Sequence, residues 1–343
     1  MVQTPRDIVK AALRFETPGR IPRDLWALPW AEMHLPKTLA ILKERYPSDL
    51  VTCSYLYSPS SRIKGDAHAA GTYVDEWGCI FSNLQDGIIG EVQTPLVSNL
   101  KNWQMVKPPY EQLPGDWQIA YDSISRFYES EDRFVIANIC PRPWERYQFI
   151  RGSENAYMDM ADFNTDGENL LKIIHEFYLA ELELWARSEV DAIMFMDDWG
   201  TQNNLLISPV LWRERFKPLY RDYCNIIHAG GKFAFMHSDG HIESIYPDLI
   251  EVGVDALNSQ LFCMDMKHIA EIARGKITFW GEIDRQHVLP SQDPEDGRSA
   301  VRKVAEHLYD PAGGIIAQFE FGPGANPETA LAIFDEWEKI NEQ

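Results

Sequence analysis

The chain has 343 residues, of which 45% are hydrophobic and 12% aromatic, which is ample for a large packed core and excludes global disorder. It carries 52 acidic and 32 basic residues, and a formal net charge of −20 repels nucleic-acid phosphates and anionic membrane surfaces. The N-terminus has no basic segment followed by an apolar one, and no apolar run approaches the ~18 residues that spanning a bilayer needs. We therefore expect a soluble, cytoplasmic protein without a nucleic-acid or membrane partner.

The N-terminal part is expected to form an elaboration over residues 1–48 and an insertion over residues 73–96. Thr4 as N-cap and Pro5 at the first helical position predict a helix that runs to residue 15. Segments 74–81 and 90–96 are typical of the two strands of a β-hairpin, with a turn signal at Asp86-Gly87 between them. This hairpin would lie over the mouth of the domain.

The rest of the chain alternates between strand and helix patterns. The predicted strands are 134–140, 191–196, 232–237, 254–258, 277–283 and 314–320, with 50–55 and 24–27 completing a set of eight. The predicted helices lie within 143–188 and over 209–229, 241–252, 265–274, 294–309 and 327–340. Alternation implies parallel strands with right-handed crossovers, so we predict one (β/α)₈ TIM-barrel domain over residues 1–343. A doubly wound open sheet is the competitor, weakened because no G-x-G-x-x-G follows the early strands.

Polar residues at strand ends would converge on one mouth of such a barrel. In the segment F-A-F-M-H-S-D-G at 233–240, alternation puts His237 and Asp239 on one face and Ser238 on the other. The two side chains can be ligands of a metal, or a histidine oriented by a carboxylate for acid–base work. The alternative is a turn at Asp239-Gly240 with a hydrogen-bonded strand-end histidine.

Two adjacent aspartates end the strand at 191–196. Alternation sends one of Asp197 and Asp198 inward and the other toward the flanking layer, where it would cap a helix or fix a loop. Trp199 is expected to form a flat apolar wall against a substrate.

Three more acids, Glu282, Asp284 and Glu320, are expected on the same rim, although Asp284 can equally be a solvated loop residue. So many carboxylates repel one another, which predicts a metal or a cationic group among them. Neutral or cationic side chains expected to bind the substrate are Gln202, Asn258, Gln260, Arg142 and Cys140. The five cysteines are odd in number and never spaced C-x-x-C, so we expect reduced thiols rather than a disulfide framework.

As a set, five segments resemble the uroporphyrinogen decarboxylase superfamily. They are M-D-D-W-G-T-Q at 196–202, I-S-P-V-L-W-R-E-R-F-K-P at 207–218, M-H-S-D-G at 236–240, P-D-L-I-E-V-G-V-D-A-L-N at 247–258 and W-G-E-I-D at 280–284. The resemblance implies a (β/α)₈ barrel. The decarboxylases of this superfamily bind a tetrapyrrole with many carboxylates through an N-terminal motif similar to R-Q-A-G-R. The corresponding residues 25–33 of this chain read L-W-A-L-P-W-A-E-M and contain no arginine.

The other branch of this superfamily comprises zinc methyltransferases that exchange methyl groups with a corrinoid protein. Their H-x-C motif aligns with His237 and Asp239, and Glu320 falls near their second cysteine. The resemblance thus implies a zinc site of His237, Asp239 and Glu320. Its ligand set of one nitrogen and two oxygens is harder than one nitrogen and two sulfurs, which suits methyl transfer from an ether or an amine. Segment 75–78, D-E-W-G, also looks like this branch.

We therefore expect a methyltransferase that moves a methyl group between a small molecule or thiol and a corrinoid carried by a partner protein. Asp198 or Glu282 would handle protons or the substrate, beside a metal on His237. The alternatives are decarboxylation of a carboxylated substrate and a non-catalytic barrel that binds a ligand or a corrinoid protein. A homodimer is compatible with the sequence.

Overall fold

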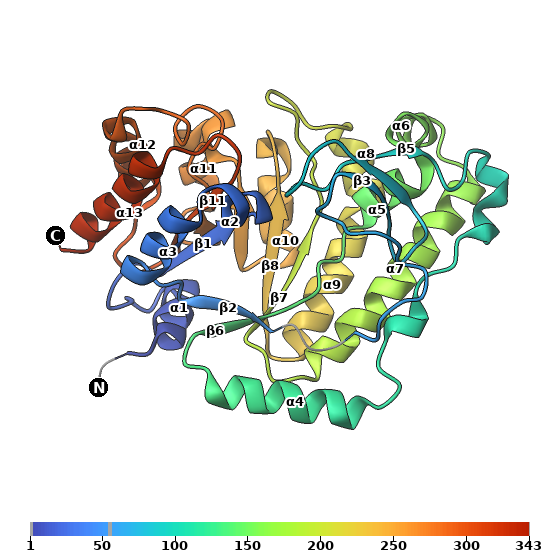
Figure 1. Cartoon of the computed structure of the whole chain (residues 1–343), viewed down its shortest axis with the longest axis horizontal. Coiled ribbons are helices and arrows are strands. Elements are labelled where there is room, and N and C mark those ends of the chain that lie inside the picture. Colours follow the sequence, from blue (N-terminus) through green and yellow to red (C-terminus); the bar gives the residue numbers. More distant parts are fainter. Residues whose placement is uncertain (1–2, 54–56, 343) are drawn as a thin grey trace.

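The computed structural model describes residues 3–53 and 57–342 and contains a nearly closed barrel of eight parallel strands (Figure 1). The strand order is β1-β11-β10-β9-β8-β7-β6-β2. The strands are β1 (Arg23–Ala27), β2 (Leu50–Cys53), β6 (Phe134–Ala137), β7 (Ala192–Met196), β8 (Phe233–Ser238), β9 (Ala256–Ser259), β10 (Thr278–Trp280) and β11 (Ile315–Phe321). The predicted (β/α)₈ barrel is confirmed. Residues 54 and 55, predicted as the end of the second strand, lie outside the described residues.

Helices surround the barrel, as crossover connections between parallel strands require. They are α1 (Pro5–Arg14), α2 (Pro29–His34), α3 (Pro36–Arg45), α4 (Trp117–Ser130), α5 (Pro143–Arg151), α6 (Ser153–Ala161), α7 (Thr165–Ala186), α8 (Pro209–Arg215), α9 (Lys217–Ala229), α10 (Tyr246–Val252), α11 (Met266–Ala273), α12 (Pro294–Leu308) and α13 (Pro327–Asn341). The single helix expected over 209–229 is thus two helices, broken at Phe216. None of the described helices is long and apolar enough to cross a membrane.

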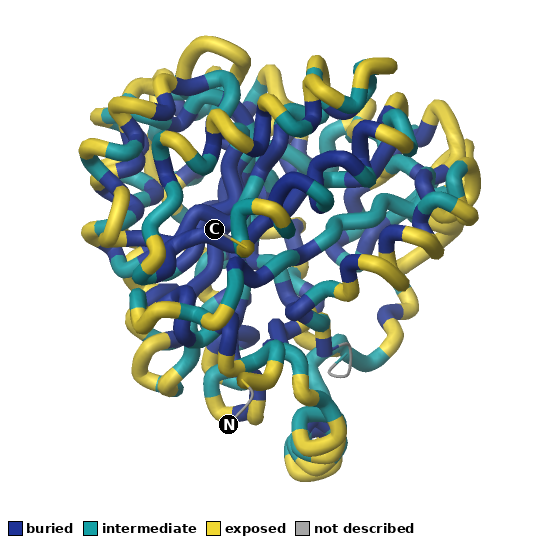
Figure 2. Tube along the Cα trace, turned by 90° about the vertical axis from the view of Figure 1, so that its left-hand side faces the viewer, coloured by how far each residue is buried: buried dark blue, intermediate teal, exposed yellow. Residues whose placement is uncertain are grey.

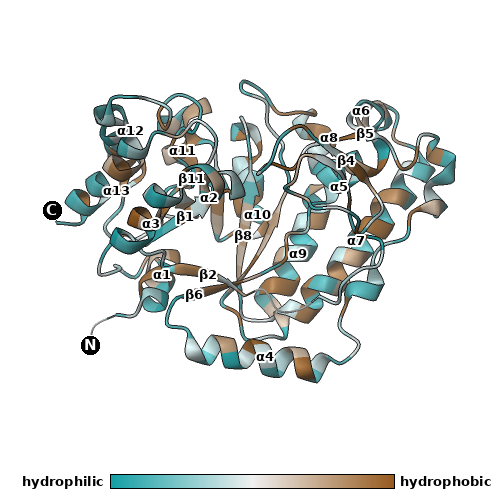
Figure 3. Cartoon of the chain, viewed as in Figure 1, coloured by the Kyte–Doolittle hydropathy of each residue, from teal (hydrophilic) through white to brown (hydrophobic). Residues whose placement is uncertain are grey.

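Helix α1 closes the barrel at the end where the strands begin. Thr4 caps it as predicted, because its hydroxyl accepts from the Asp7 amide while the Asp7 carboxylate accepts from the Thr4 amide. Val9 and Leu13 on its buried face pack into the barrel interior against Phe134 and neighbouring strand residues. Figure 2 shows this buried interior in dark blue, and Figure 3 shows β2 and β6 as hydrophobic segments. The opposite end, where the strands finish, is left for polar side chains.

The insertion contains the predicted hairpin, with its turn at residues 86–87, as two strands of a three-stranded antiparallel sheet. Its strands are β3 (Gly71–Val74), β4 (Ile80–Asn83) and β5 (Glu91–Thr94). Segment 74–81 is not one strand, because the chain turns at residues 75–78. The Asp75 carboxylate accepts hydrogen bonds from the amides of Trp77 and Cys79, and Gly78 adopts a φ of 90°. This aspartate turn joins β3 to β4.

A buried arginine fastens the antiparallel sheet to α5. Arg146 pairs with Asp75 and, at 3.1 Å, with Glu76. Its guanidinium also lies 5.0 Å from the ring centre of Trp77. Because a guanidinium is removed from water at high cost, these partners fix the position of the sheet over α5.

The barrel has a seam between β1 and β2, which lie at the two ends of the strand order. A hydrogen bond from the Asp49 amide to the Arg23 carbonyl oxygen links the two segments at the start of the strands. A cavity of about 480 Å³ follows the seam and is lined from β1, β2 and the β6–α5 connection, including Trp26, Thr52 and Cys140. The barrel interior is therefore not completely filled along this side.

Candidate active site

His237 lies at the end of β8 and is held in one orientation. Its Nδ1 is 2.6 Å from Oδ1 of Asn258, whose Nδ2 donates to the Trp280 carbonyl oxygen at 2.6 Å and to Gln318 Oε1 at 3.1 Å. These two donations fix the Asn258 amide, so its oxygen faces the imidazole and Nδ1 carries the proton. The other nitrogen, Nε2, is left for the mouth of the barrel.

Two carboxylates face His237 Nε2. Asp198 Oδ1 and Asp239 Oδ1 each lie 3.5 Å from it. Burial acts to lower the pKa of His237, but the charges of Asp239 and Asp198 outweigh it, so the pKa is raised above its usual value. The predicted same-face placement of His237 and Asp239 is confirmed, and Ser238 on the opposite face accepts from the Trp199 amide.

His237, Asp198 and Asp239 also fit a metal ion by geometry. Their ligand atoms lie within 4.8 Å of one another, the one group of three potential ligands found among the described residues. Tetrahedral Zn²⁺ with bonds of about 2.0–2.1 Å needs ligand atoms about 3.3 Å apart, close to the two 3.5 Å separations. The Nδ1–H donation to Asn258 is the outer hydrogen bond that a metal-binding histidine typically makes. Asp239 Oδ1 is buried without a hydrogen-bond partner, so it is available as a ligand.

Arg285, which the sequence analysis missed, binds the remaining acids of the mouth. Its guanidinium pairs with Asp239, lies 3.1 Å from Glu320 and 3.6 Å from Glu282. Glu320, expected as a metal ligand, therefore pairs with Arg285 and not with His237. Asp198 lies beside His237 at the position that was expected for Glu320. Arg285 is thus a cationic group of the kind that was predicted to offset the repulsion between these carboxylates. Arg285 follows β10 in a loop, where no periodic pattern marks it.

Glu282 is the least satisfied acid of the site. Its side chain is 3% exposed, and neither carboxylate oxygen has a hydrogen-bond partner. Burial raises its pKa to about 8, with the nearby Asp239 and Glu320 adding to the effect and Arg285 opposing it. A carboxyl group in this state carries a proton near neutral pH and can release it to a reacting atom.

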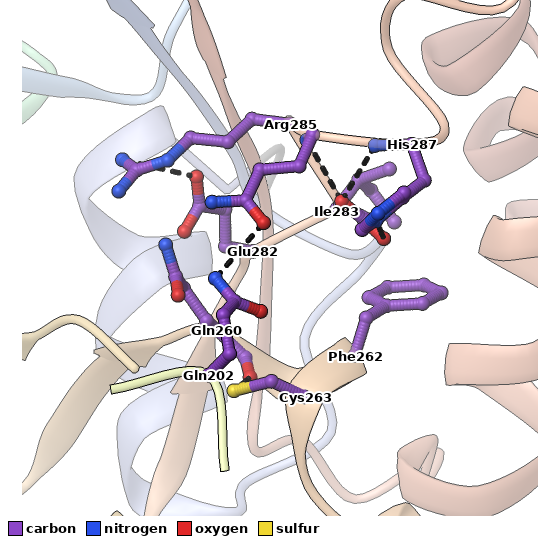
Figure 4. Close-up of a pocket in the computed structure, with 10 residues that line it drawn as sticks. Gln202, Gln260, Phe262, Cys263, Glu282, Ile283, Arg285 and His287 are labelled. Carbon is purple, nitrogen blue, oxygen red and sulfur yellow. Dashed lines mark hydrogen bonds and ion pairs between the residues drawn. The ribbon is translucent and has the colours of Figure 1, made fainter. Parts of the chain in front are cut away.

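A small pocket of about 60 Å³ opens beside Glu282, lined by residues from three loops (Figure 4). Gln202 and Gln286 bridge two of these loops with a 2.9 Å hydrogen bond between their amides. Gln260, expected to bind substrate, lines the same pocket, while its Oε1 accepts from the Gly240 amide. The Asp284 carboxylate accepts a hydrogen bond from the Gln286 backbone amide, as expected for a loop residue. The pocket therefore offers three side-chain amides together with the ionisable groups of Glu282, Asp284 and Arg285.

The two adjacent aspartates have separate roles, as predicted. Asp197 is fully buried and accepts from the amides of Trp144 and Glu145 and from the Tyr220 hydroxyl. It therefore secures the start of α5, whereas Asp198 faces His237.

The prediction for Trp199 is wrong. Its side chain is 0% exposed and stacks on Trp144, with ring centres 5.4 Å apart, in the layer between strands and helices. It forms no wall for a substrate. The aromatic ring beside His237 is instead Trp26 of β1, with ring centres 5.2 Å apart. Trp199 lies on the same side of the chain as Asp197, since both contact the Tyr220 hydroxyl, whereas Asp198 between them faces His237.

Arg142 and Cys140 lie in the connection between β6 and α5. Cys140 lines the seam cavity, and burial raises the pKa of its thiol to about 12, so it is not a nucleophile at neutral pH. Arg142 lies 3.8 Å from Glu145, a second acid that the sequence analysis missed. Burial raises the pKa of Glu145, opposed by the charge of Arg142 and supported by that of Asp198.

Comparison with known proteins agrees with this architecture. The model of the uroporphyrinogen decarboxylase (URO-D) family matches residues 76–339. A methyltransferase from Methanosarcina mazei has a similar structure, with a TM-score of 0.68 over 99% of both chains at 15% sequence identity. An endo-β-1,4-xylanase from Gloeophyllum trabeum is less similar, with a TM-score of 0.48 at 10% identity over 95% of this chain and 98% of that one. No curated protein matches the sequence. The family match covers most of the chain, and it therefore belongs to the uroporphyrinogen decarboxylase family.

Proposed function

We propose that this protein transfers a methyl group between a methylated small molecule and a corrinoid carried by a partner protein, with the help of a metal. The observation that carries the proposal is His237: Asn258 holds its Nδ1, and its Nε2 faces two carboxylates at near-tetrahedral spacing. A decarboxylase without a cofactor does not require this arrangement. The fold shared with the Methanosarcina methyltransferase is compatible with the proposal.

The residues that would hold the metal are His237, Asp198 and Asp239. One nitrogen and two oxygens form a hard donor set that still suits zinc. A bound Zn²⁺ would supply Lewis-acid chemistry, polarising an oxygen or nitrogen of the substrate next to the methyl group. Arg285 contacts Asp239 through Oδ2, so its charge orients that carboxylate while Oδ1 stays free.

Glu282 is positioned to handle the proton. When a methyl ether loses its methyl group as an electrophile, the bonding electron pair stays on the ether oxygen, which then takes a proton. A protonated Glu282 buried beside this mouth can supply that proton, and the product is the free alcohol. In the reverse direction the same carboxylate accepts it.

Decarboxylation of a tetrapyrrole is the second candidate, because the family is named for it. The two arginines next to β1, Arg20 and Arg23, already have acidic partners. Arg20 pairs with Asp49 at 2.6 Å, and Arg23 pairs with Glu338. Neither arginine is therefore unpaired and ready to receive a polycarboxylate.

Elemental analysis and a methyl-transfer assay test the proposal together. We expect about one zinc per chain after loading, and near-zero zinc with a loss of activity of at least ~10³-fold in His237→Ala. Activity is followed as the absorbance change when cob(I)alamin takes a methyl group from methyl ethers, methylamines or methyl thioethers, or when methylcob(III)alamin gives one to the corresponding alcohols, amines or thiols. Arg126→Met, at an exposed arginine on α4, is the matched control. Turnover of uroporphyrinogen by the metal-free protein would overturn the proposal, as would ligand binding without any methyl transfer.

A further inference from the structure

Two arginines lie at this end of the barrel, and they differ in how their donors are used. Arg285 has three acidic partners, Asp239, Glu282 and Glu320. Arg142 has one hydrogen bond among the described residues, a long one of 3.4 Å from Nε to the Cys140 carbonyl oxygen. A guanidinium has five N–H donors, so most of those on Arg142 are unspent.

The one acid near Arg142 does not use these donors. Glu145 Oε1 lies 3.8 Å from Arg142 Nη1, beyond hydrogen-bond distance, and Glu145 Oε2 is buried with no partner. The Arg142 side chain is 31% exposed, so it is partly accessible to a ligand. An arginine at the edge of a site with unspent donors is suited to a planar anion, above all a carboxylate, which it binds with two parallel hydrogen bonds.

The seam cavity is lined by residues 136–140, which directly precede the Pro141-Arg142 pair in the chain. It is lined by Cys140, whose carbonyl oxygen receives the Arg142 hydrogen bond, and by Trp26, whose ring lies against His237. At about 480 Å³ it has the volume of a site for a small organic molecule. Its lining includes Met194, Ile136 and Leu50 but no lysine, arginine or histidine, and its one acid, Asp24, is already saturated with hydrogen bonds. The cavity therefore fits an uncharged, apolar molecular body.

We propose that the methylated substrate carries a single carboxylate, bound by Arg142, on an apolar body that occupies the seam cavity. This inference rests on the proposed function and adds the class of substrate. One free arginine matches one carboxylate. A polyanion would meet Glu145, Asp198 and the net charge of −20, and the described residues that line the seam cavity include no arginine or lysine to compensate it.

Isothermal titration calorimetry with 4-methoxybenzoate and 4-methoxybenzamide as probes tests this directly. The two molecules share a ring and a methyl ether and differ in the charged group. We expect wild-type protein to bind the benzoate at least ~10-fold more tightly than the amide, and Arg142→Met to abolish that preference. Arg142→Lys keeps the charge without the paired donors and should retain only part of the preference. Equal affinity of wild-type protein for both probes, or an unchanged preference in Arg142→Met, overturns the inference.

Two further variants keep the outcome interpretable. Arg285→Met should alter zinc content while leaving the preference for the benzoate, because the charge of Arg285 is already matched by Asp239, Glu320 and Glu282. Thermal melting of each variant identifies any that fail to fold, and Trp26→Phe then provides a second test by weakening both probes equally. Because binding is measured without methyl transfer, a failed transfer reaction alongside a preserved benzoate preference contradicts the proposed function alone.

Discussion

Asp24 on β1 and Glu282 after β10 are both buried acids at the barrel interior, yet their surroundings are opposite. Asp24 is 8% exposed and accepts hydrogen bonds from Leu25 N, Ser48 Oγ and the indole nitrogens of Trp26 and Trp280. Glu282 is 3% exposed and accepts none. A buried acid that accepts four hydrogen bonds contributes to stability. A buried acid that accepts none lowers stability, and its presence indicates a role in catalysis. The same change from carboxylate to amide should therefore have different consequences at the two positions.

Among substitutions of the buried acids, the largest effect is expected for Glu282→Gln. The amide cannot donate or accept the reaction proton, so methyl transfer should fall by ~10²–10³-fold. The free energy of unfolding should change by less than about 1 kcal/mol, because no hydrogen bond to Glu282 is lost. Steady-state rates and urea denaturation of the same preparation measure both quantities. A large loss of stability with retained activity would place Glu282 among the structural acids.

Asp24→Asn should show the reverse pattern. The amide nitrogen would face indole N–H groups that now donate to a carboxylate, leaving buried donors unpaired. We expect the free energy of unfolding to fall by roughly 2–4 kcal/mol, and the zinc content to remain. Urea denaturation with elemental analysis checks this, and loss of zinc without loss of stability would contradict it.

Glu181 on α7 accepts more hydrogen bonds than Glu282 and fewer than Asp24, and its substitution is expected to have the smallest effect of the three. It accepts one hydrogen bond, from the Tyr57 hydroxyl at 2.9 Å, and burial raises its pKa to about 8. The folded state therefore holds a proton that the unfolded state has released, and stability falls as pH rises from the usual glutamate range to about 8. The difference in unfolding free energy between wild type and Glu181→Gln should change by up to about 1.4 kcal/mol between pH 6 and pH 7. Urea titrations at both pH values measure it, and parallel curves would refute the shifted pKa.

Much of the fold and part of the site could be predicted from the sequence, because both depend on short-range periodicity. Alternation along β8 placed His237 and Asp239 together, and strand–helix repetition predicted the barrel. Trp199 was expected at the substrate from its residue type alone, and its ring is instead fully buried beside Asp197 and Tyr220. Arg285 lies in a loop and Trp26 on a strand distant in sequence from β8, so only the closed barrel reveals that they meet the site.

The insertion shows a different limit. Segment 74–81 has the apolar content of a strand, but the Asp75 side chain competes for the backbone amides of Trp77 and Cys79 and turns the chain. The exchange of Glu320 for Asp198 beside His237 has a similar origin. Glu320 lies 3.1 Å from Arg285 and Asp198 lies 3.5 Å from His237, and the spacing of the motif does not predict where the loop residue Arg285 lies.

The pairing of Arg146 with Asp75 and Glu76 limits how this protein can be shortened. A variant engineered without residues 71–94 would leave the Arg146 guanidinium buried without an acidic partner. Such a change typically lowers the free energy of unfolding by about 3–5 kcal/mol. Such a truncation would need a compensating change, for instance Arg146→Met, before a minimal scaffold could be expected to survive purification.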